Sequence, residues 1–243
     1  MKQLRLLLAV TGLAASFASA QPPAAPTAKA AAPVDLTGNW VSIVTEDWRF
    51  RMITAKAGDY DGITLTPAGQ ALANAWDPAK DTAAGAQCKA YGAAGLMRIP
   101  TRLKINWAND NVLRIETDAG KQVRLMKFGT AQDSVGAGTL QGVSKARWEI
   151  QRERGNPNVS GSLEVVTTQM APGYVRRNGV PYSEQAKLTE YYERVKEANG
   201  DEYLIIISQL EDPVYIGQPV LTSTNFKREK DDSKWDPSDC RAD

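Results

Sequence analysis

Two arginines in a short aromatic segment carry the clearest chemical signal in this sequence. Residues 46–52 read EDWRFRM, and the alternation of a strand places Trp48 with the apolar side chains and Arg49 and Arg51 on the opposite face. Neighbouring guanidinium groups bind carboxylate or phosphate through paired hydrogen bonds. If the apolar face packs in a core, the arginines are simply solvated. If the strand belongs to a barrel with a polar interior, they face a ligand.

A second segment mixes aromatic rings and charges in a similar way. Residues 189–194 read TEYYER, so Tyr191 falls on one face of the predicted strand and Glu190 and Tyr192 share the other. Ordinary cross-strand pairing explains this pattern. The alternative is a ligand wall in which a tyrosine ring stacks and a carboxylate acts as general acid or base.

Two further arginines flank Pro100, where a long loop is expected to rejoin the sheet. This position suits the rim of a pocket, although exposed surface charge explains it as well. The candidate ligand-binding residues are Trp48, Arg49, Arg51, Arg98, Arg102, Glu190, Tyr191 and Tyr192.

The chain contains no histidine, which restricts its chemistry more than any motif does. Ser-His-Asp and Cys-His arrangements are impossible, as are zinc sites that use imidazole. The glycines form no phosphate-binding loop, and the aspartates do not match a calcium loop. The sequence therefore assigns no catalytic residue and predicts neither a metal site nor a cofactor. Whether the protein is an enzyme stays open.

The two cysteines, Cys88 and Cys240, are expected to form a disulfide between a loop in the first half and the C-terminal end. A redox-active pair is the alternative, but the sequence has no Cys-x-x-Cys spacing.

The first twenty residues have the pattern of an export signal. Lys2 and Arg5 precede the apolar run 6–17, and Ala18-Ser19-Ala20 forms a small-x-small cleavage site. The run is shorter than the roughly 20 residues of a membrane-spanning helix. We expect a signal peptide over 1–20 that is cleaved after Ala20, no transmembrane segment, and a periplasmic or secreted protein.

Composition defines the rest of the domain organisation. Residues 21–34 are rich in Pro and Ala and predict a disordered tether, followed by one domain over 35–243. Of 29 basic residues two lie in the signal, so the mature chain has 27 against 28 acidic residues, a net charge of about −1. This balance argues against nucleic acid as a partner.

Period-two alternation in short runs predicts an all-β fold. Thr66-Pro67 opens one short helix that ends near Trp76, and a long loop follows over 77–100. About ten antiparallel strands would hide their edges as a barrel or a strongly curved sheet, with Asn199-Gly200 as the clearest hairpin turn. The predicted strands are 39–45, 47–54, 101–107, 112–117, 121–128, 145–152, 161–170, 187–196, 202–209 and 221–228.

Two resemblances add to this picture. DLTGNW at 35–40 resembles the Gly-x-Trp opening of lipocalin-like barrels, which implies that Trp40 lies at the barrel base beneath a basic residue of the last strand, Lys227 or Arg228. The blocks at 38–52, 76–100 and 178–194 are similar to an uncharacterised family of exported proteobacterial proteins, which implies location and a single domain but no chemistry.

These observations favour a periplasmic or secreted binding protein that holds a small apolar or amphipathic molecule in a β-barrel cavity. One alternative is a histidine-free isomerase, lyase or hydratase that uses Tyr and Glu or Asp in the same cavity. Another is a structural protein with a partner in the cell envelope.

Overall fold

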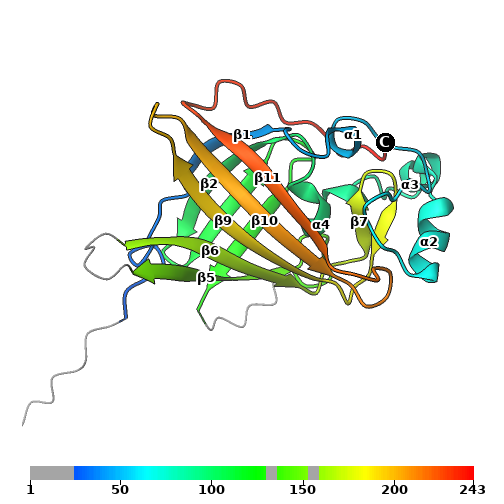
Figure 1. Cartoon of the computed structure of the whole chain (residues 1–243), viewed down its shortest axis with the longest axis horizontal. Coiled ribbons are helices and arrows are strands. Elements are labelled where there is room, and N and C mark those ends of the chain that lie inside the picture. Colours follow the sequence, from blue (N-terminus) through cyan, green and yellow to red (C-terminus); the bar gives the residue numbers. More distant parts are fainter. Residues whose placement is uncertain (1–24, 130–135, 153–158) are drawn as a thin grey trace, which may run out of the picture.

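A closed barrel of nine strands forms the body of the protein (Figure 1). The computed structural model describes residues 25–129, 136–152 and 159–243, so the predicted signal peptide lies outside the described residues. Around the barrel the strands follow the order β1, β11, β10, β9, β6, β5, β4, β3, β2. They are β1 (Gly38–Ile43), β2 (Arg102–Asn109), β3 (Val112–Thr117), β4 (Val123–Phe128), β5 (Val143–Arg152), β6 (Val159–Thr168), β9 (Lys187–Lys196), β10 (Glu202–Glu211) and β11 (Val220–Glu229).

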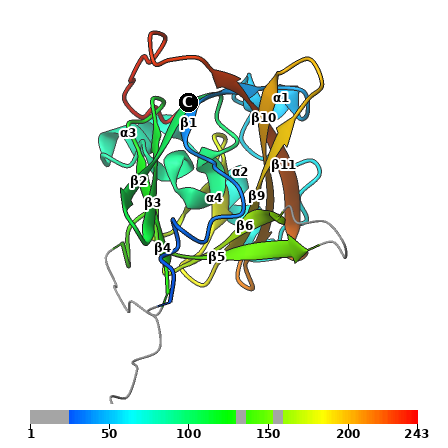
Figure 2. The ribbon, with the colours of Figure 1, turned by 90° about the vertical axis from the view of Figure 1, so that its left-hand side faces the viewer.

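The all-β prediction is confirmed, but the sheet is mixed rather than purely antiparallel. Strands β4 and β5 run parallel, from the pair Met126 and Ser144 to the pair Phe128 and Ala146. The other neighbours in the ring are antiparallel. Beside the parallel pair, the Phe128 ring lies 5.3 Å from that of Trp148 and 5.6 Å from that of Trp107. The view along the barrel in Figure 2 shows β3, β4 and β5 next to one another.

Nine of the ten predicted strands are barrel strands, and the predicted hairpin at Asn199-Gly200 joins β9 to β10. Gly200 has a φ of 88°, which glycine adopts without steric cost. The prediction of a strand over 47–54 is wrong. This segment contains the single-turn helix α1 (Trp48–Arg51), which begins after Asp47.

The reason for this difference is visible in the burial of the alternating residues. Trp48 and Met52, predicted to share a buried strand face, are 62% and 57% exposed, whereas Arg51 is 2% exposed. The backbone N–H groups of Phe50 and Arg51 both donate to the carbonyl of Asp47, which closes the turn. The buried Arg51 side chain contacts Arg98, far along the chain, and such contacts favour a helical turn over a strand in this segment.

Several short elements gather at one end of the barrel (Figure 1). The predicted helix is confirmed as α2 (Pro67–Asn74), where the side chain of Thr66 accepts a hydrogen bond from Gly69 N. Where a loop was predicted, the chain forms α3 (Pro78–Ala83), a 3₁₀ turn at Lys89–Tyr91 and α4 (Ala93–Leu96). The hairpin of β7 (Gly173–Arg176) and β8 (Val180–Tyr182) completes this group.

The predicted disulfide between Cys88 and Cys240 is present and joins residues 152 positions apart. It fastens the C-terminal segment to the short elements at the barrel end. No helix among the described residues has the length and apolar character needed to cross a bilayer.

Apolar side chains fill the part of the barrel away from the helices. Trp40 lies fully buried there, and the guanidinium carbon of Arg228 is 5.1 Å from the centre of its ring, so the predicted cation over Trp40 is Arg228. Gly38 has a φ of 130°, which residues with a Cβ rarely adopt, and this explains the glycine in Gly-x-Trp. Other members of this cluster are Leu103, Ile105, Leu113, Ile115, Met126, Phe128, Leu163, Val165, Tyr192, Leu204, Ile206 and Phe226.

Part of the predicted tether lies against the barrel. The N–H of Ala28 donates to Asn111 Oδ1 at 2.9 Å, and the carbonyl of Ala28 accepts from Trp148 Nε1 at 2.8 Å. Val34 packs against the apolar cluster. Residues 21–24 of the same segment lie outside the described residues.

Candidate functional site

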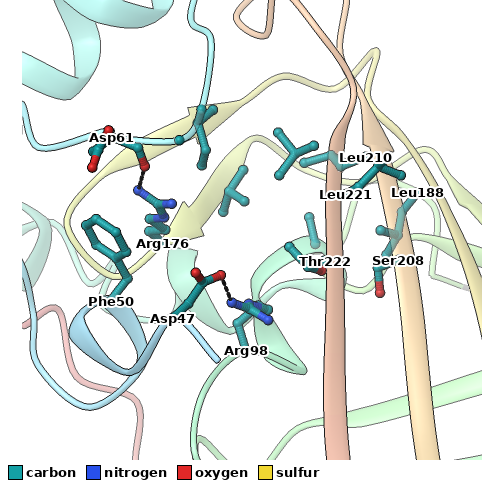
Figure 3. A pocket seen from close by; sticks show the side chains of 15 residues that line it. Asp47, Phe50, Asp61, Arg98, Arg176, Leu188, Ser208, Leu210, Leu221 and Thr222 are labelled. Carbon is teal, nitrogen blue, oxygen red and sulfur yellow. Dashed lines mark hydrogen bonds and ion pairs between the residues drawn. The ribbon is translucent and has the colours of Figure 1, made fainter. Parts of the chain in front are cut away.

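A cavity of about 320 Å³, here called the end pocket, lies where the barrel meets the short elements (Figure 3). The barrel contributes one wall through β9, β10 and β11, and the segments around α1, α4 and β7 contribute the other. Its lining residues are Asp47, Phe50, Asp61, Gly62, Ile63, Ala94, Arg98, Val175, Arg176, Leu188, Ser208, Leu210, Val220, Leu221 and Thr222.

The barrel wall of the end pocket consists mainly of inward-facing side chains. Ser208 and Leu210 are in phase with Leu204 and Ile206, which are buried in the barrel. Across the sheet, Ser208 pairs with Thr222, and Leu210 pairs with both Leu188 and Val220. The end pocket is therefore the mouth of the barrel.

Arg98 connects the two walls of the pocket. It follows α4, and its Nη1 donates to the carbonyl of Ser223 at 2.9 Å, while Nη2 binds Asp47 Oδ2 at 2.5 Å. Burial lowers the pKa of Arg98, and the carboxylates of Asp47 and Glu46 oppose this effect. Even a lowered arginine pKa leaves the group charged at neutral pH, so a fixed cation stands in the barrel mouth.

Arg176, at the end of β7, is the second cation of the pocket. Its guanidinium carbon lies 3.8 Å from the centre of the Phe50 ring, and its Nη1 donates to the backbone carbonyl of Asp61 at 2.8 Å. Burial lowers its pKa as well, with a smaller opposing effect from Asp47. The aromatic ring and the carbonyl hold the guanidinium at the edge of the pocket, as Figure 3 shows.

Arg51 lies behind this wall and supports it. Its Nε donates to the backbone carbonyl of Arg98 at 3.0 Å, and its Nη1 forms an ion pair with Glu46. Arg177 in turn donates from Nη2 to the backbone carbonyl of Arg51 at 3.0 Å. These contacts explain why residues 48–51 form a helical turn rather than a strand.

A buried polar group lies inside the barrel near the pocket. Glu190, which pairs across the sheet with Ser208, accepts hydrogen bonds from Arg124 Nη1 at 3.0 Å and Nη2 at 2.6 Å. Tyr192 and Thr167 complete the network through their hydroxyls. Because Arg124 occupies both carboxylate oxygens of Glu190, this group suits a structural role better than proton transfer.

The structure brings some of the predicted site residues together and separates others. Arg98 lines the pocket, and Arg51 lies behind it. Arg49 is exposed, paired with Asp59 at 2.5 Å, and Trp48 beside it also faces solvent.

The remaining predicted residues lie on the barrel itself. Arg102 forms an ion pair with Glu229 at 3.0 Å. Tyr191 lies on the outer face, where its hydroxyl donates to Glu164 Oε1 at 3.4 Å. The predicted division of faces is confirmed, because Glu190 and Tyr192 are buried inside and Tyr191 is partly exposed.

Sequence reasoning did not select Asp47, Phe50 and Arg176 as site residues, and it did not consider Arg124 at all. For Arg124 a signal exists, since it is in phase with the buried Met126 and Phe128 on β4. For Arg176 no local signal exists, since its site is formed by loops from distant parts of the chain.

Among the described residues no group of three or more acidic or cysteine side chains is placed to hold a metal ion. Comparison of the chain with protein-family models, with curated proteins and with solved structures gives no match.

Proposed function

We propose that this protein binds a small amphipathic anion in the end pocket, outside the cytoplasm. The observation that supports it best is the contrast between the two walls of the pocket. Arg98 and Arg176 lie on one wall beside Asp47 and Asp61, and Leu188, Leu210 and Val220 lie on the other. Arg98 is paired with Asp47, whereas Arg176 donates to a neutral backbone carbonyl. A carboxylate at Arg176 and a short apolar tail toward the barrel would satisfy both walls.

The size of the pocket supports a small ligand. A volume of about 320 Å³ lies at the lower end of the range typical of small-molecule sites. Further into the barrel, the Arg124–Glu190 pair and the apolar cluster occupy the interior. The ligand is therefore expected to occupy the mouth of the barrel rather than its centre.

The predicted export signal and the disulfide between Cys88 and Cys240 support a location outside the cytoplasm, because such bonds persist in oxidising compartments.

Three probes test this proposal by isothermal titration calorimetry. Octanoate has both a carboxylate and a tail, 1-octanol has the tail without the charge, and acetate has the charge without the tail. We expect octanoate to bind at least about tenfold more tightly than either of the others, since each missing contact costs about 1.4 kcal/mol or more.

Two variants locate the binding site. Arg176→Met should weaken octanoate binding about tenfold, whereas Arg147→Met, a change at an exposed arginine outside the pocket, should leave it unchanged. Equal affinity for octanoate and 1-octanol, or for octanoate and acetate, would show that only one wall of the pocket binds ligand and would refute the proposal.

A further inference from the structure

A second and much smaller cavity, here called the inner cavity, lies next to the end pocket. Its volume is about 20 Å³, and it shares Phe50, Arg98, Val175 and Arg176 with the end pocket. Such a space accommodates one guest of about the size of a water molecule. Its full lining is Phe50, Arg51, Ala90, Gly95, Arg98, Ile99, Val175, Arg176 and Arg177, which includes four arginines and no acidic residue.

One of these arginines has an unused donor. Arg51 is almost fully buried, its Nε and Nη1 are bonded to Arg98 O and Glu46, and its Nη2 has no hydrogen-bond partner among the described residues. A buried donor without an acceptor is costly, and more so when it belongs to a charged group. The position calls for an acceptor that the described chain does not supply.

The charges around the inner cavity do not balance. Glu46 pairs with Arg51, and Asp47 pairs with Arg98. Arg176 and Arg177 instead donate to the backbone carbonyls of Asp61 and Arg51, which carry no net charge. Two of the four guanidinium groups thus have a carboxylate in an ion pair, whereas Asp47, Asp59 and Asp61 act on Arg176 through their charges without an ion pair. Neighbouring guanidiniums repel one another in a poorly solvated site.

The pKa values of these arginines agree with the charge imbalance. Burial lowers the pKa of Arg51, and the nearby charge of Arg98 lowers it further, against the opposing effect of Glu46. Burial also lowers the pKa of Arg176, with a smaller contribution from Arg98, against the opposing carboxylates of Asp47, Asp59 and Asp61. A bound anion would reverse this repulsion.

We propose that the inner cavity binds one small inorganic anion of the size of chloride. The size of the cavity excludes an organic carboxylate, so this site is distinct from the one proposed for the amphipathic ligand. The anion would accept from Arg51 Nη2 and offset the charge of Arg176 and Arg177. Because Arg177 joins the end of β7 to α1 and Arg51 joins α1 to the segment of Arg98, anion binding would stiffen the wall of the end pocket.

The test compares thermal unfolding of the protein in sodium chloride and in sodium gluconate at equal ionic strength. Gluconate is too large for the inner cavity, so only chloride should raise the midpoint in a saturable way. The expected rise is about 3–6 °C once chloride reaches roughly ten times its Kd. Bromide should give the same effect, and crystals grown in bromide should show its anomalous signal between Arg51 and Arg177.

Arg177→Gln is the informative variant, because Arg177 lines the inner cavity but not the end pocket. It should raise the Kd for chloride, read from the midpoint shift, about tenfold. The matched control, Arg147→Gln, should keep the wild-type response to chloride. Arg51→Met should abolish the response, but its burial makes loss of folding a separate outcome that Arg177→Gln avoids.

Equal midpoints in chloride and gluconate at every concentration, together with no bromide signal in the inner cavity, would overturn this proposal and leave water as the guest. An undiminished chloride effect in Arg177→Gln would also overturn it. If the wild-type protein did not bind octanoate, the proposed organic ligand would be refuted, whereas the proposal of a chloride site would stand.

Discussion

Arg124 and Glu190 face each other inside the barrel and form a bidentate ion pair, with both side chains closed off from solvent. Burial acts to lower the pKa of Arg124, but the carboxylate of Glu190 outweighs it, so the net pKa lies above the ordinary value. The pair links β4 to β9, which are not neighbours in the ring. It therefore connects two non-adjacent strands across the barrel interior.

Removal of one partner should destabilise the protein strongly. Arg124→Met or Glu190→Leu should each lower the free energy of unfolding by about 3–5 kcal/mol, because the remaining charge is buried without a counter-ion. The double variant Arg124→Met/Glu190→Leu should recover most of the loss. Urea denaturation measures all three. A double variant whose loss equals the sum of the two single losses would show that the pair is not coupled.

Substitution by Phe should have opposite effects on the free energy of unfolding at two buried tyrosines. Tyr182 is fully buried, and its hydroxyl has no hydrogen-bond partner among the described residues, so Tyr182→Phe should raise the free energy of unfolding by about 1 kcal/mol. Tyr192 bonds to Arg124 and Glu190, so Tyr192→Phe should lower it by about 1–2 kcal/mol. Equal effects of the two changes, measured by urea denaturation, would contradict these assignments.

The stability of the protein should fall in alkaline solution. Burial raises the pKa of Tyr174, Tyr182 and Tyr192 above the ordinary value near 10. A raised folded-state pKa contributes stability that is fully present below the unfolded pKa and is lost as pH rises toward the folded value. We therefore expect the free energy of unfolding to decrease above about pH 10.

Urea denaturation at a series of pH values measures this trend, and the ultraviolet absorbance of tyrosinate reports the ionisation. In the variant Tyr182→Phe the decrease should be smaller. A free energy of unfolding that stays constant above about pH 10 would mean that these hydroxyls ionise as freely in the folded protein as in the unfolded chain.

Reduction of the disulfide should release the C-terminal segment from the barrel end. A bond between residues 152 positions apart stabilises by up to about 4–5 kcal/mol in the chain-entropy model. We expect the double variant Cys88→Ser/Cys240→Ser to lose about 2–5 kcal/mol in urea denaturation. As a control, Asp239→Asn breaks only an exposed ion pair with Lys121 and should change stability by less than about 1 kcal/mol. If the double cysteine variant lost as little stability as Asp239→Asn, noncovalent contacts rather than the disulfide would hold the C-terminal segment at the barrel end.

A larger side chain at the barrel mouth should block the end pocket. Ser208 faces the pocket, and its neighbour Ile207 is exposed on the outer face of β10. Ser208→Phe should reduce octanoate binding at least about tenfold by occupying the cavity, whereas Ile207→Phe should have no effect. Calorimetry measures both, with circular dichroism as a check on folding. Unchanged binding in Ser208→Phe would place the ligand elsewhere.

The barrel strands were predictable because their alternation matches their burial. On β9, Leu188, Glu190 and Tyr192 point inward in phase, and the Asn199-Gly200 turn fixes the register to β10. An ion pair inside the barrel could have been inferred too, since Glu190 and Arg124 each occupy a position in phase with buried residues. The sequence does not reveal that these two face each other, because ring order depends on long-range pairing.

The end pocket was mostly beyond prediction. The same alternation that marks the strands occurs in residues 48–52, yet contacts of Arg51 with Arg98 and Glu46 turn this segment into a helix. Arg98 and Arg176 come from segments far apart in the chain, and no periodicity relates them. Loop conformation, set by tertiary contacts, determines where they meet.

The single parallel contact between β4 and β5 follows from a rule of parity. Neighbouring strands can all be antiparallel in a closed barrel only when the number of strands is even, and this barrel has nine. One seam with like-pointing neighbours is therefore unavoidable, and no exchange of side chains can remove it. Only the gain or loss of a whole strand would make such a cylinder uniformly alternating.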